Sequence, residues 1–290
     1  MYEHLLFPTD GSDGATAVFE HALDIAAAHG STIHVLHVAD TSRDSVTRVG
    51  GEVVDALERE GEEIVAEAAE RAERRGVDTV TEVLQGEPHS TIVDYAADRE
   101  VDLVVMPTHG RGRLERLLLG STTGRVLRRA DVPVLTLRPD GDRPRYPYRD
   151  VLVPTDGSDC ARAALRVGID VANADGAALH LLSVVDLASL GVDVRADIQA
   201  ASLEESAERI IEEASAFVED AGVESVSGTV ESGSSVHRAI RSYVESHDVD
   251  VVVLGTHGRT GFDRYLLGSV AEKLVRTSPV PVLTVRNPAE

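Results

Sequence analysis

Short runs of apolar residues alternate along this chain with longer stretches in which apolar residues recur every three or four positions. In the first half the apolar runs cover residues 5–8, 32–38, 77–84, 103–106 and 132–137. Such runs are typical of buried parallel strands, and the stretches between them are typical of amphipathic helices. The pattern predicts helices over residues 13–29 and 52–75, each ended by a glycine, Gly30 or Gly76.

The second half repeats this order. Its apolar runs cover residues 151–153, 179–185, 223–230, 251–254 and 280–285, and its helical stretches cover residues 159–174, 197–221 and 235–247. Strands that alternate with helices form a parallel sheet with helices on both faces. We predict an α/β fold with two tandem, doubly wound, five-stranded parallel-sheet domains of the Rossmann-like type, at residues 1–138 and 149–290. Residues 139–148, rich in proline, glycine and charge, are the predicted linker.

Two motifs occur once in each half and follow the first and fourth predicted strands. Residues 8–12 read PTDGS, as do residues 154–158 at an offset of 146 (156 − 10). Residues 108–111 read THGR, as do residues 256–259 at an offset of 148 (257 − 109), and LLGS follows each copy. Ligands of open parallel sheets bind beyond the carboxyl ends of the strands where the winding direction reverses. The sequence therefore predicts one binding crevice per half, between these two motifs.

The second of these loops has the composition of a phosphate-binding loop. It reads Gly255-Thr256-His257-Gly258, then nine residues (259–267), then Gly268 and Ser269 at the start of a predicted helix. Glycines allow left-handed backbone and let amides approach an anion, and a helix N-terminus adds free N–H groups. No Gly-Lys-Ser/Thr follows, so the loop is not a P-loop.

Asp156, at the end of the first strand of the second half, offers only hydrogen-bond acceptors when it is ionised. Adenine presents an exocyclic amine to such an acceptor, whereas guanine presents a carbonyl oxygen, so a carboxylate here favours adenine. The alternative is that Asp156 or Ser158 only caps the next helix. Because the matching loop follows the fourth strand, we assign Asp156 to the ligand and Ser158 to the cap.

These motifs make the chain resemble tandem members of the universal stress protein family over nearly the whole of both halves. The ATP-binding members carry glycine, two residues, glycine, nine residues, glycine and then serine or threonine, and Gly255, Gly258, Gly268 and Ser269 match this pattern in full. The resemblance implies an adenine nucleotide alpha hydrolase-like fold and ATP as the ligand, with Mg²⁺ or Mn²⁺ on the phosphates. No metal-ligand cluster in the sequence itself requires an ion.

The resemblance also implies the residues of each site. In the second half these are Pro154, Thr155, Asp156 and Val184 around the adenine, and Leu254, Gly255, His257, Gly258, Arg259, Gly268, Ser269 and Val270 around the ribose and phosphates. The matching residues of the first half are Pro8, Thr9, Asp10, Val38, Met106, His109, Gly110, Arg111, Gly120, Ser121 and Thr122. The two histidines have loop hydrogen bonds as an alternative role, and the two arginines have pairing with surface carboxylates.

The first half departs from the family pattern at one position, because Pro107 stands where the second half has Gly255. Proline fixes φ at about −65° and has no N–H. If the first glycine of the pattern uses a positive φ or donates its amide, the first site is altered. If Pro107 only ends the strand, little changes. We hypothesise that the second half binds ATP more tightly than the first.

Composition limits the location and the partners of the protein. The chain has one cysteine, Cys160, which excludes an internal disulfide, and no apolar run approaches the roughly 20 residues that span a bilayer. No basic and apolar leader precedes the first strand, so we expect a soluble, cytoplasmic protein. The formal net charge is -22, and a surface of this charge repels nucleic acid and anionic membranes.

The same composition indicates a high-salt cytoplasm, as in a halophilic archaeon. Lys273 is the one lysine among the 28 basic residues, and acidic residues number 50. Concentrated salt screens the self-repulsion of such a surface. A coding bias that replaces lysine by arginine explains the lysine deficit but not the acidity.

We hypothesise that the protein is an ATP-binding, nucleotide-dependent regulator of the stress response rather than a catalyst. The sequence shows no nucleophile beside a base and no paired carboxylates, so at most weak ATP hydrolysis is expected. The alternatives are a slow ATPase and a ligand-free interaction scaffold. By the same resemblance the last strands, residues 132–137 and 280–285, pair as an intramolecular pseudo-dimer, and homo-oligomers built through the helices stay open.

Overall fold

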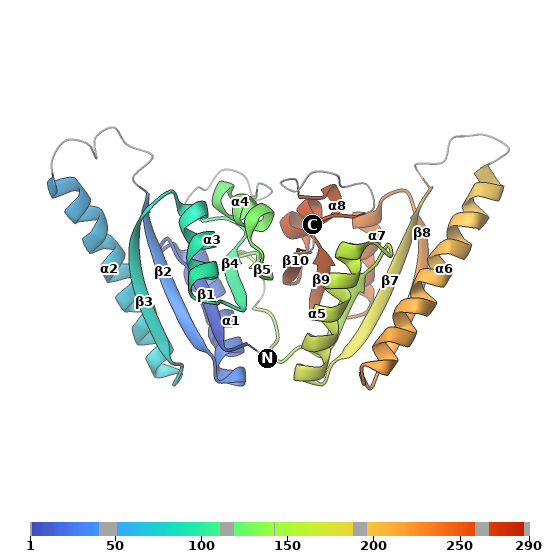
Figure 1. Ribbon diagram of the computed structural model, residues 1–290, viewed down its shortest axis with the longest axis horizontal. Helices are drawn as coiled ribbons and strands as arrows, with labels where there is room; N and C mark the ends of the chain where they lie inside the picture. The colour runs from blue at the N-terminus through green and yellow to red at the C-terminus, as the bar shows by residue number, and fades with distance from the viewer. Residues whose placement is uncertain are drawn as a thin grey trace. The chain divides into compact units, whose positions relative to one another are not determined.

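The chain forms two units, each built around parallel strands covered by helices (Figure 1). The computed structural model describes residues 2–40, 51–110, 119–141, 143–187, 196–258 and 267–286, without the side chains of residues 51–56 and 196–199. The units are Tyr2–Tyr146, blue to green in Figure 1, and Pro147–Glu290, yellow-green to red. The division between them falls inside residues 139–148, the segment rich in proline, glycine and charge.

The described residues of the first unit form five strands and four helices. The strands are β1 (His4–Pro8), β2 (Thr32–Asp40), β3 (Thr79–Gly86), β4 (Leu103–Pro107) and β5 (Val134–Leu137). The helices are α1 (Asp13–His29), α2 (Gly51–Arg74), α3 (Pro88–Asp98) and α4 (Ser121–Arg129). The strands pair in parallel in the order β3-β2-β1-β4-β5. The predicted α/β architecture is confirmed, and the structure adds α3 and α4 to the two helices predicted in this half.

The second unit repeats the same arrangement within its described residues. The strands are β6 (Asp150–Pro154), β7 (Ala178–Asp186), β8 (Val226–Gly233), β9 (Val251–Gly255) and β10 (Val282–Val285). The helices are α5 (Asp159–Asp175), α6 (Ala196–Asp220), α7 (Val236–Ser246) and α8 (Ser269–Thr277). The parallel order is β10-β9-β6-β7-β8.

The winding direction of each sheet reverses between its first and fourth strands. From β1 the chain adds β2 and β3 on one side and then crosses to place β4 on the other side of β1. Right-handed crossovers in opposite directions place α1 and α2 on one face of the sheet and α3 and α4 on the other. In the second unit β6 and β9 are the corresponding neighbours. The carboxyl ends of these strand pairs therefore border the crevice in which such folds bind ligands.

The predicted starts of four strands, β3, β5, β8 and β10, lie two or three residues too early. Val77 and Val223 explain two of these differences, because both are buried but precede the strand pairing. Val77 donates its amide to the carbonyl of Ala72 at 3.0 Å and so closes the end of α2. An apolar run in the sequence indicates buried residues. Here the buried residues extend beyond those that pair in the strand.

The segment that follows β5 lies along α1, and we call residues 138–141 and 143–146 the linker strap. At the start of α1, a Cβ added to Gly14 would lie 3.0 Å from Cβ of Pro139. In the middle, Nη2 of Arg143 lies 2.6 and 2.9 Å from the two carboxylate oxygens of Asp24. At the end, the hydroxyl of Tyr146 lies 2.6 Å from Nε2 of His29. The strap therefore contacts α1 along its whole length.

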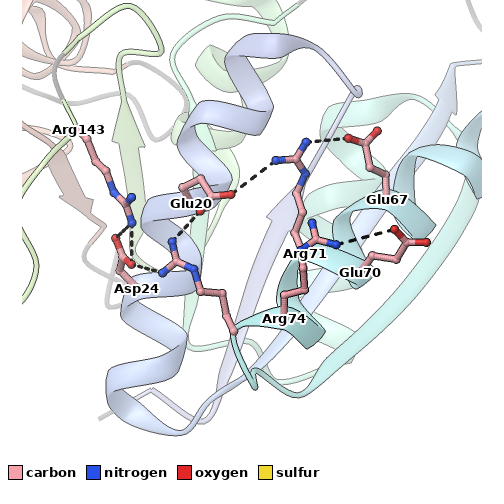
Figure 2. A network of polar contacts seen from close by, with 8 residues as sticks. Glu20, Asp24, Glu67, Glu70, Arg71, Arg74 and Arg143 are labelled. Carbon is pink, nitrogen blue, oxygen red and sulfur yellow. Dashed lines mark hydrogen bonds and ion pairs between the residues drawn. The ribbon is translucent and has the colours of Figure 1, made fainter.

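An ion-pair network joins the strap, α1 and α2 (Figure 2). Arg75, just after α2, contacts Asp24 at 2.6 Å and Glu20 at 2.8 Å. Arg71 contacts Glu67 at 2.8 Å and reaches Glu20 at 3.7 Å. Each such exposed pair contributes at most about 1 kcal/mol, but shared partners hold one another in place.

The second unit has a different surface at the equivalent positions. At an offset of 146, Arg71 and Arg75 correspond to Phe217 and Ala221, and Glu20 corresponds to Arg166. Phe217 is 45% exposed. The network between α1 and α2 is therefore a property of the first unit.

His21 of α1 predicts a pH dependence of stability. The ring is 1% exposed and meets the Tyr146 ring edge to face at 5.8 Å. Burial lowers the pKa of His21 to about 4, against a raising effect of Asp24, and Arg143 lowers it further. The folded state keeps His21 neutral, whereas the unfolded chain takes up a proton near pH 6.5. The contribution of neutral His21 to the free energy of unfolding is therefore full above pH 6.5. It is lost as the pH falls toward 4, by up to about 3 kcal/mol.

Urea unfolding of the wild type and of His21→Phe at pH 7 and pH 5 measures this effect. The wild type is expected to lose more unfolding free energy between the two pH values than His21→Phe does. His247→Phe, at an exposed histidine, is the matched control and should keep the wild-type dependence. Equal pH dependence in the wild type and in His21→Phe contradicts the assignment.

Candidate functional site

The PTDGS motif forms the same turn after the first strand of each unit. In the second unit the amide of Thr155 donates to the carbonyl of Leu182 at 2.9 Å and continues the pairing of β6 with β7. The Thr155 hydroxyl then accepts from the amide of Gly157 at 3.2 Å. Gly157 has a φ of 77° and its counterpart Gly11 a φ of 71°, so the left-handed glycine of the site lies in this turn.

Asp156 and Ser158 make different contacts at the start of α5, which bears on the two predicted roles, ligand contact and helix capping. Oγ of Ser158 accepts from the amide of Ala161 at 3.2 Å and caps α5, which confirms its predicted role. Oδ1 of Asp156 accepts from the amide of Ser158 at 3.0 Å and does not cap the helix. Asp10 and Ser12 repeat both contacts in the first unit. One carboxylate oxygen of each aspartate therefore fixes the turn, and a ligand role for the other stays a prediction.

The loop after the fourth strand is closed by a backbone hydrogen bond. The amide of Gly268 donates to the carbonyl of Thr256 at 2.7 Å, and Gly120 and Thr108 repeat this bond at 2.8 Å. Within each loop the threonine hydroxyl lies 3.1 Å from Nδ1 of the following histidine, His257 or His109. Each histidine thus makes the loop hydrogen bond that was the alternative to a ligand role. The contact uses Nδ1, so the threonine does not engage Nε2.

The two motifs meet at the carboxyl edge of the sheet. A Cβ added to Gly258 would lie 2.8 Å from Oδ2 of Asp156, and a Cβ added to Gly110 would overlap the carboxylate of Asp10. A side chain at either glycine would therefore displace the aspartate. The sequence predicted that β-strand ends bring these motifs together, and their close approach places an acceptor and a glycine loop side by side at this edge.

Two reasons for the loop glycines followed from the sequence, left-handed backbone and close approach. The first is wrong, because Gly255, Gly258 and Gly268 have no positive φ, and φ of Gly268 is −58°. Space is the constraint instead. A Cβ on Gly268 would lie 2.9 Å from the carbonyl oxygen of Thr256, which belongs to the backbone and cannot turn aside. The glycines are needed for close approach, which is also what a bound phosphate requires.

The helices that follow the loops begin without a side-chain cap. The N-cap residues Gly120 of α4 and Gly268 of α8 make no cap hydrogen bond, whereas Ser12 and Ser158 cap α1 and α5. The first amides of a helix have no intrahelical acceptor, and the helix dipole favours an anion there. The first amides of α4 and α8 are thus left to another acceptor, as are those of α3 and α7, whose N-cap residues Glu87 and Ser235 also make no side-chain cap hydrogen bond.

The exchange of Pro107 for Gly255 is matched by a second exchange that sequence reasoning missed. A Cβ on Gly255 would lie 2.9 Å from Cβ of Cys160 at the start of α5. The first unit has Gly14 at the position of Cys160 (160 − 146), and the atoms nearest its Cβ position are Cβ and Cγ of Pro139, at 3.0 and 3.2 Å. Because Gly255 has no positive φ, Pro107 does not replace a left-handed residue. Comparison of the two repeats at both positions is the signal that could have found this pair.

A histidine also distinguishes the first crevice. Nδ1 of His37 lies 2.9 Å from the carbonyl of Thr9, and this contact fixes the residue before Asp10. Gly61 of α2 makes room for the ring, since a Cβ there would lie 2.7 Å from Cδ2 of His37. The second unit has Ser183 and Ala207 at these positions (37 + 146 and 61 + 146).

The remaining predicted residues lie around the same edge, with two outside the described residues. Val38 and Val184 are in the last three residues of β2 and β7, and Met106 and Leu254 are in β4 and β9. Ser121 and Thr122 open α4, and Ser269 and Val270 open α8. Arg111 and Arg259 lie outside the described residues.

Neither a metal cluster nor a membrane-spanning helix occurs in the part of the chain that the structure describes. No three His, Cys, Asp or Glu side chains in these ranges are grouped to hold an ion. No helix in the same ranges is long and apolar enough to cross a bilayer.

Comparison with known proteins matches both units to the same family. The family model for the universal stress protein family matches residues 1–138 and 147–286. A universal stress protein of Methanocaldococcus jannaschii is 36% identical over 141 residues, which are 48% of this chain and 83% of the relative. A universal stress protein of Mycobacterium tuberculosis is 32% identical over 239 residues, 79% of this chain and 78% of the relative.

A solved structure extends the likeness to both units together. The crystal structure of a universal stress protein from Archaeoglobus fulgidus has a TM-score of 0.76 and 26% identity. The match covers 99% of this chain and 97% of that one. With the duplicated fold and the duplicated motifs, these matches show that the chain belongs to the universal stress protein family, as a tandem two-domain member.

Proposed function

We propose that the protein binds ATP in the crevice between β6 and β9, and acts as a nucleotide-dependent regulator in the stress response. The observation that supports this most is the approach of Gly258 to Oδ2 of Asp156 at the head of α8, whose first turn has no side-chain cap. Acceptor, glycine loop and helix N-terminus are the parts that an adenine nucleotide needs, and they come from three separate segments.

Different residues of the second unit contact the base and the phosphates of the proposed ligand. Oδ1 of Asp156 accepts from the amide of Ser158, and Oδ2, the oxygen nearest the Cβ position of Gly258, is assigned to the exocyclic amine of the base. The Thr256 and Gly258 loop and the amides at Ser269 and Val270 take the phosphates, with the hydroxyl of Ser269 as a further donor. The resemblance to ATP-binding family members supports a divalent ion, which would neutralise charge on the phosphates.

Regulation rather than turnover is the activity we infer. The crevice of the second unit offers Asp156 and His257, but Asp156 is engaged in the turn and His257 is engaged by Thr256. Both side chains therefore already form hydrogen bonds within the turn and the loop. Steady release of ADP from ATP by the purified chain would favour a slow ATPase instead.

The two crevices are predicted to differ in affinity. Gly258→Ala should push Asp156 aside and lower ATP affinity of the full chain about tenfold, or about 1.4 kcal/mol. Gly110→Ala should have a smaller effect on total binding, because we expect the second unit to bind more tightly. Gly233→Ala is the control, since its Cβ would meet nothing closer than 3.9 Å. Calorimetric titration measures all three, and equal losses from both crevice variants would reject the difference.

Asp156 is predicted to set the preference for adenine. An unpaired buried acceptor costs about 1–3 kcal/mol, so the wild type should bind ATP about 5- to 150-fold more tightly than GTP. Asp156→Asn should reduce this ratio, because the amide offers a donor as well as an acceptor. Asp159→Asn removes the same charge from the exposed start of α5 and should leave the ratio unchanged. Unaltered selectivity in Asp156→Asn would remove the aspartate from base recognition.

Salt is predicted to strengthen ATP binding at the low end of its range. A chain of net charge -22 repels a polyphosphate, and the Debye length falls from about 30 Å at 0.01 M salt to about 10 Å at 0.1 M. ATP titrations in KCl between these concentrations should therefore show a dissociation constant that falls as the KCl concentration increases. Steady weakening over the same range would mean that the local charges of the crevice dominate.

A further inference from the structure

Three side chains near the starts of the strands of the second unit, away from the crevice, form a hydrogen-bonded line. Asp150 is the first residue of β6, and His180 and Ser227 are register partners on the neighbouring strands β7 and β8. Leu152, two residues after Asp150, is the partner of His180 on β6, so all three side chains share one face of the sheet. They lie 30 and 47 positions apart in the chain, and no local motif in the sequence shows them.

The imidazole of His180 joins the other two side chains. Nε2 of His180 lies 3.1 Å from Oδ1 of Asp150, and Nδ1 lies 3.2 Å from Oγ of Ser227. An ionised carboxylate only accepts hydrogen bonds, so Nε2 of the neutral ring carries the proton and Nδ1 is the acceptor. The hydroxyl of Ser227 therefore donates to a ring nitrogen that can take up its proton.

Exposure along this line suits a reaction with a dissolved reagent. The side chain of His180 is 14% exposed, whereas Ser227 is exposed on β8, the edge strand of the unit (Figure 1). The hydroxyl can thus meet a reagent from solution while the ring behind it is largely buried.

Two further contacts hold the carboxylate and the ring in place. The amide of Asp150 donates to Oδ2 of Asp250 at 3.2 Å, which fixes the start of β6. The hydroxyl of Tyr243 in α7 lies 3.2 Å from Nδ1 of His180. Nδ1 therefore has two hydroxyl donors, and Tyr243 is only 2% exposed. Ser227 is the donor that a reagent can reach.

The first unit keeps the histidine and the tyrosine of this cluster but replaces the carboxylate. Nδ1 of His34 lies 3.0 Å from the hydroxyl of Tyr95, as in the corresponding contact of the second unit. His4 stands at the position of Asp150 (150 − 146), with its Nδ1 3.4 Å from Nε2 of His34. A neutral imidazole can donate or accept, so His4 does not fix the proton of His34 in the way that a carboxylate does.

The serine is also replaced in the first unit. Thr81 stands at the position of Ser227 (227 − 146). Among the residues that the structure describes, no hydrogen bond joins Thr81 to His34, whose ring contacts Tyr95 and His4. One chain therefore holds a hydroxyl beside an oriented base and, at the matching position, a hydroxyl without one.

We propose that Ser227 is a covalent acylation site for activated esters, with His180 as its general base and Asp150 as the residue that positions the base. As Oγ of Ser227 bonds to the carbonyl carbon of the ester, its proton passes to Nδ1 of His180. The bond from that carbon to the leaving oxygen then breaks, the oxygen keeps the electron pair, and the imidazolium gives the proton to it. The products are an ester on Ser227 and the free alcohol or phenol.

An acyl donor suits this site better than a phosphoryl donor. Transfer of a phosphoryl group needs cations that balance the charge on its oxygens. In the described ranges no arginine or lysine forms an ion pair with Asp150, and the charged member of the cluster is this carboxylate. A neutral ester meets no repulsion from it. The site shares no residue with the crevice, so the proposal stands apart from nucleotide binding.

Acetylation of the full chain by p-nitrophenyl acetate tests the proposal. Competing nucleophiles are few, because Lys273 is the one lysine of the chain and Cys160, its one cysteine, is buried. We expect peptide mass spectrometry to find the acetyl group on Ser227 about a hundredfold faster than on Ser232, an exposed serine of the same strand. Thr81 should stay unlabelled over the same period.

Variants separate base catalysis from simple exposure of the serine. His180→Gln should slow acetylation of Ser227 about a hundredfold and abolish its increase with pH, because no ring remains to take the proton. Asp150→Asn should slow it as well, since an amide that donates to Nε2 favours the tautomer whose Nδ1 already carries the proton. Tyr243→Phe should raise the rate, because Ser227 becomes the one hydroxyl donor to Nδ1. His34→Gln, the same change in the first unit, should leave the rate unaltered.

Two results would overturn the proposal. One is acetylation spread evenly over the exposed serines of the wild type. The other is an equal rate at Ser227 in the wild type and in His180→Gln, with urea unfolding showing that both are folded. If His180→Gln does not fold, Tyr243→Phe decides, because an unchanged or lower rate in that variant contradicts the donation from Ser227 to Nδ1. These measurements use no nucleotide, so their failure leaves the proposed function intact.

Discussion

The close approach of a strand-end carboxylate to a glycine loop is the constraint on which the rest of each unit depends. Asp156 can lie beside Gly258 only because this glycine has no Cβ, and because β6 and β9 are direct neighbours where the winding reverses. The Asx contact to Ser158 fixes the carboxylate, and the Gly268 to Thr256 hydrogen bond fixes the loop. Replacement of any of these parts would move the others.

Duplication has kept this constraint and changed the residues around it in matched sets. Pro107 and Gly14 of the first unit stand where the second unit has Gly255 and Cys160, and Gly255 lies close against Cys160. His37 likewise needs Gly61 above it. Such paired changes are expected in close-packed interiors, where an added atom on one element must be offset on its neighbour. The two crevices therefore share one backbone design but present different chemical surroundings.

The two units are packed alike but differ in the charged residues on their surfaces. Both units bury their sheets in the same manner, but the first joins α1, α2 and the linker strap through Asp24, whereas the second leaves Phe217 exposed at the equivalent of Arg71. Hydrogen bonds from Arg143 and Arg75 keep the pKa of Asp24 low in spite of its partial burial, which by itself raises it. The strap is thus fastened by ion pairs that salt weakens.

The sequence by itself determined the parallel sheets, their duplication and the two motifs, because apolar periodicity and repeated spacing are local properties that survive without coordinates. It also assigned the cap to Ser158 correctly. Only the tertiary structure decided that Gly258 lies against Asp156, that Gly14 packs on Pro139, and that Arg143 and Tyr146 lie against α1. These contacts join residues about 100 to 125 positions apart, and chain spacing carries no information about such contacts until the fold brings them together.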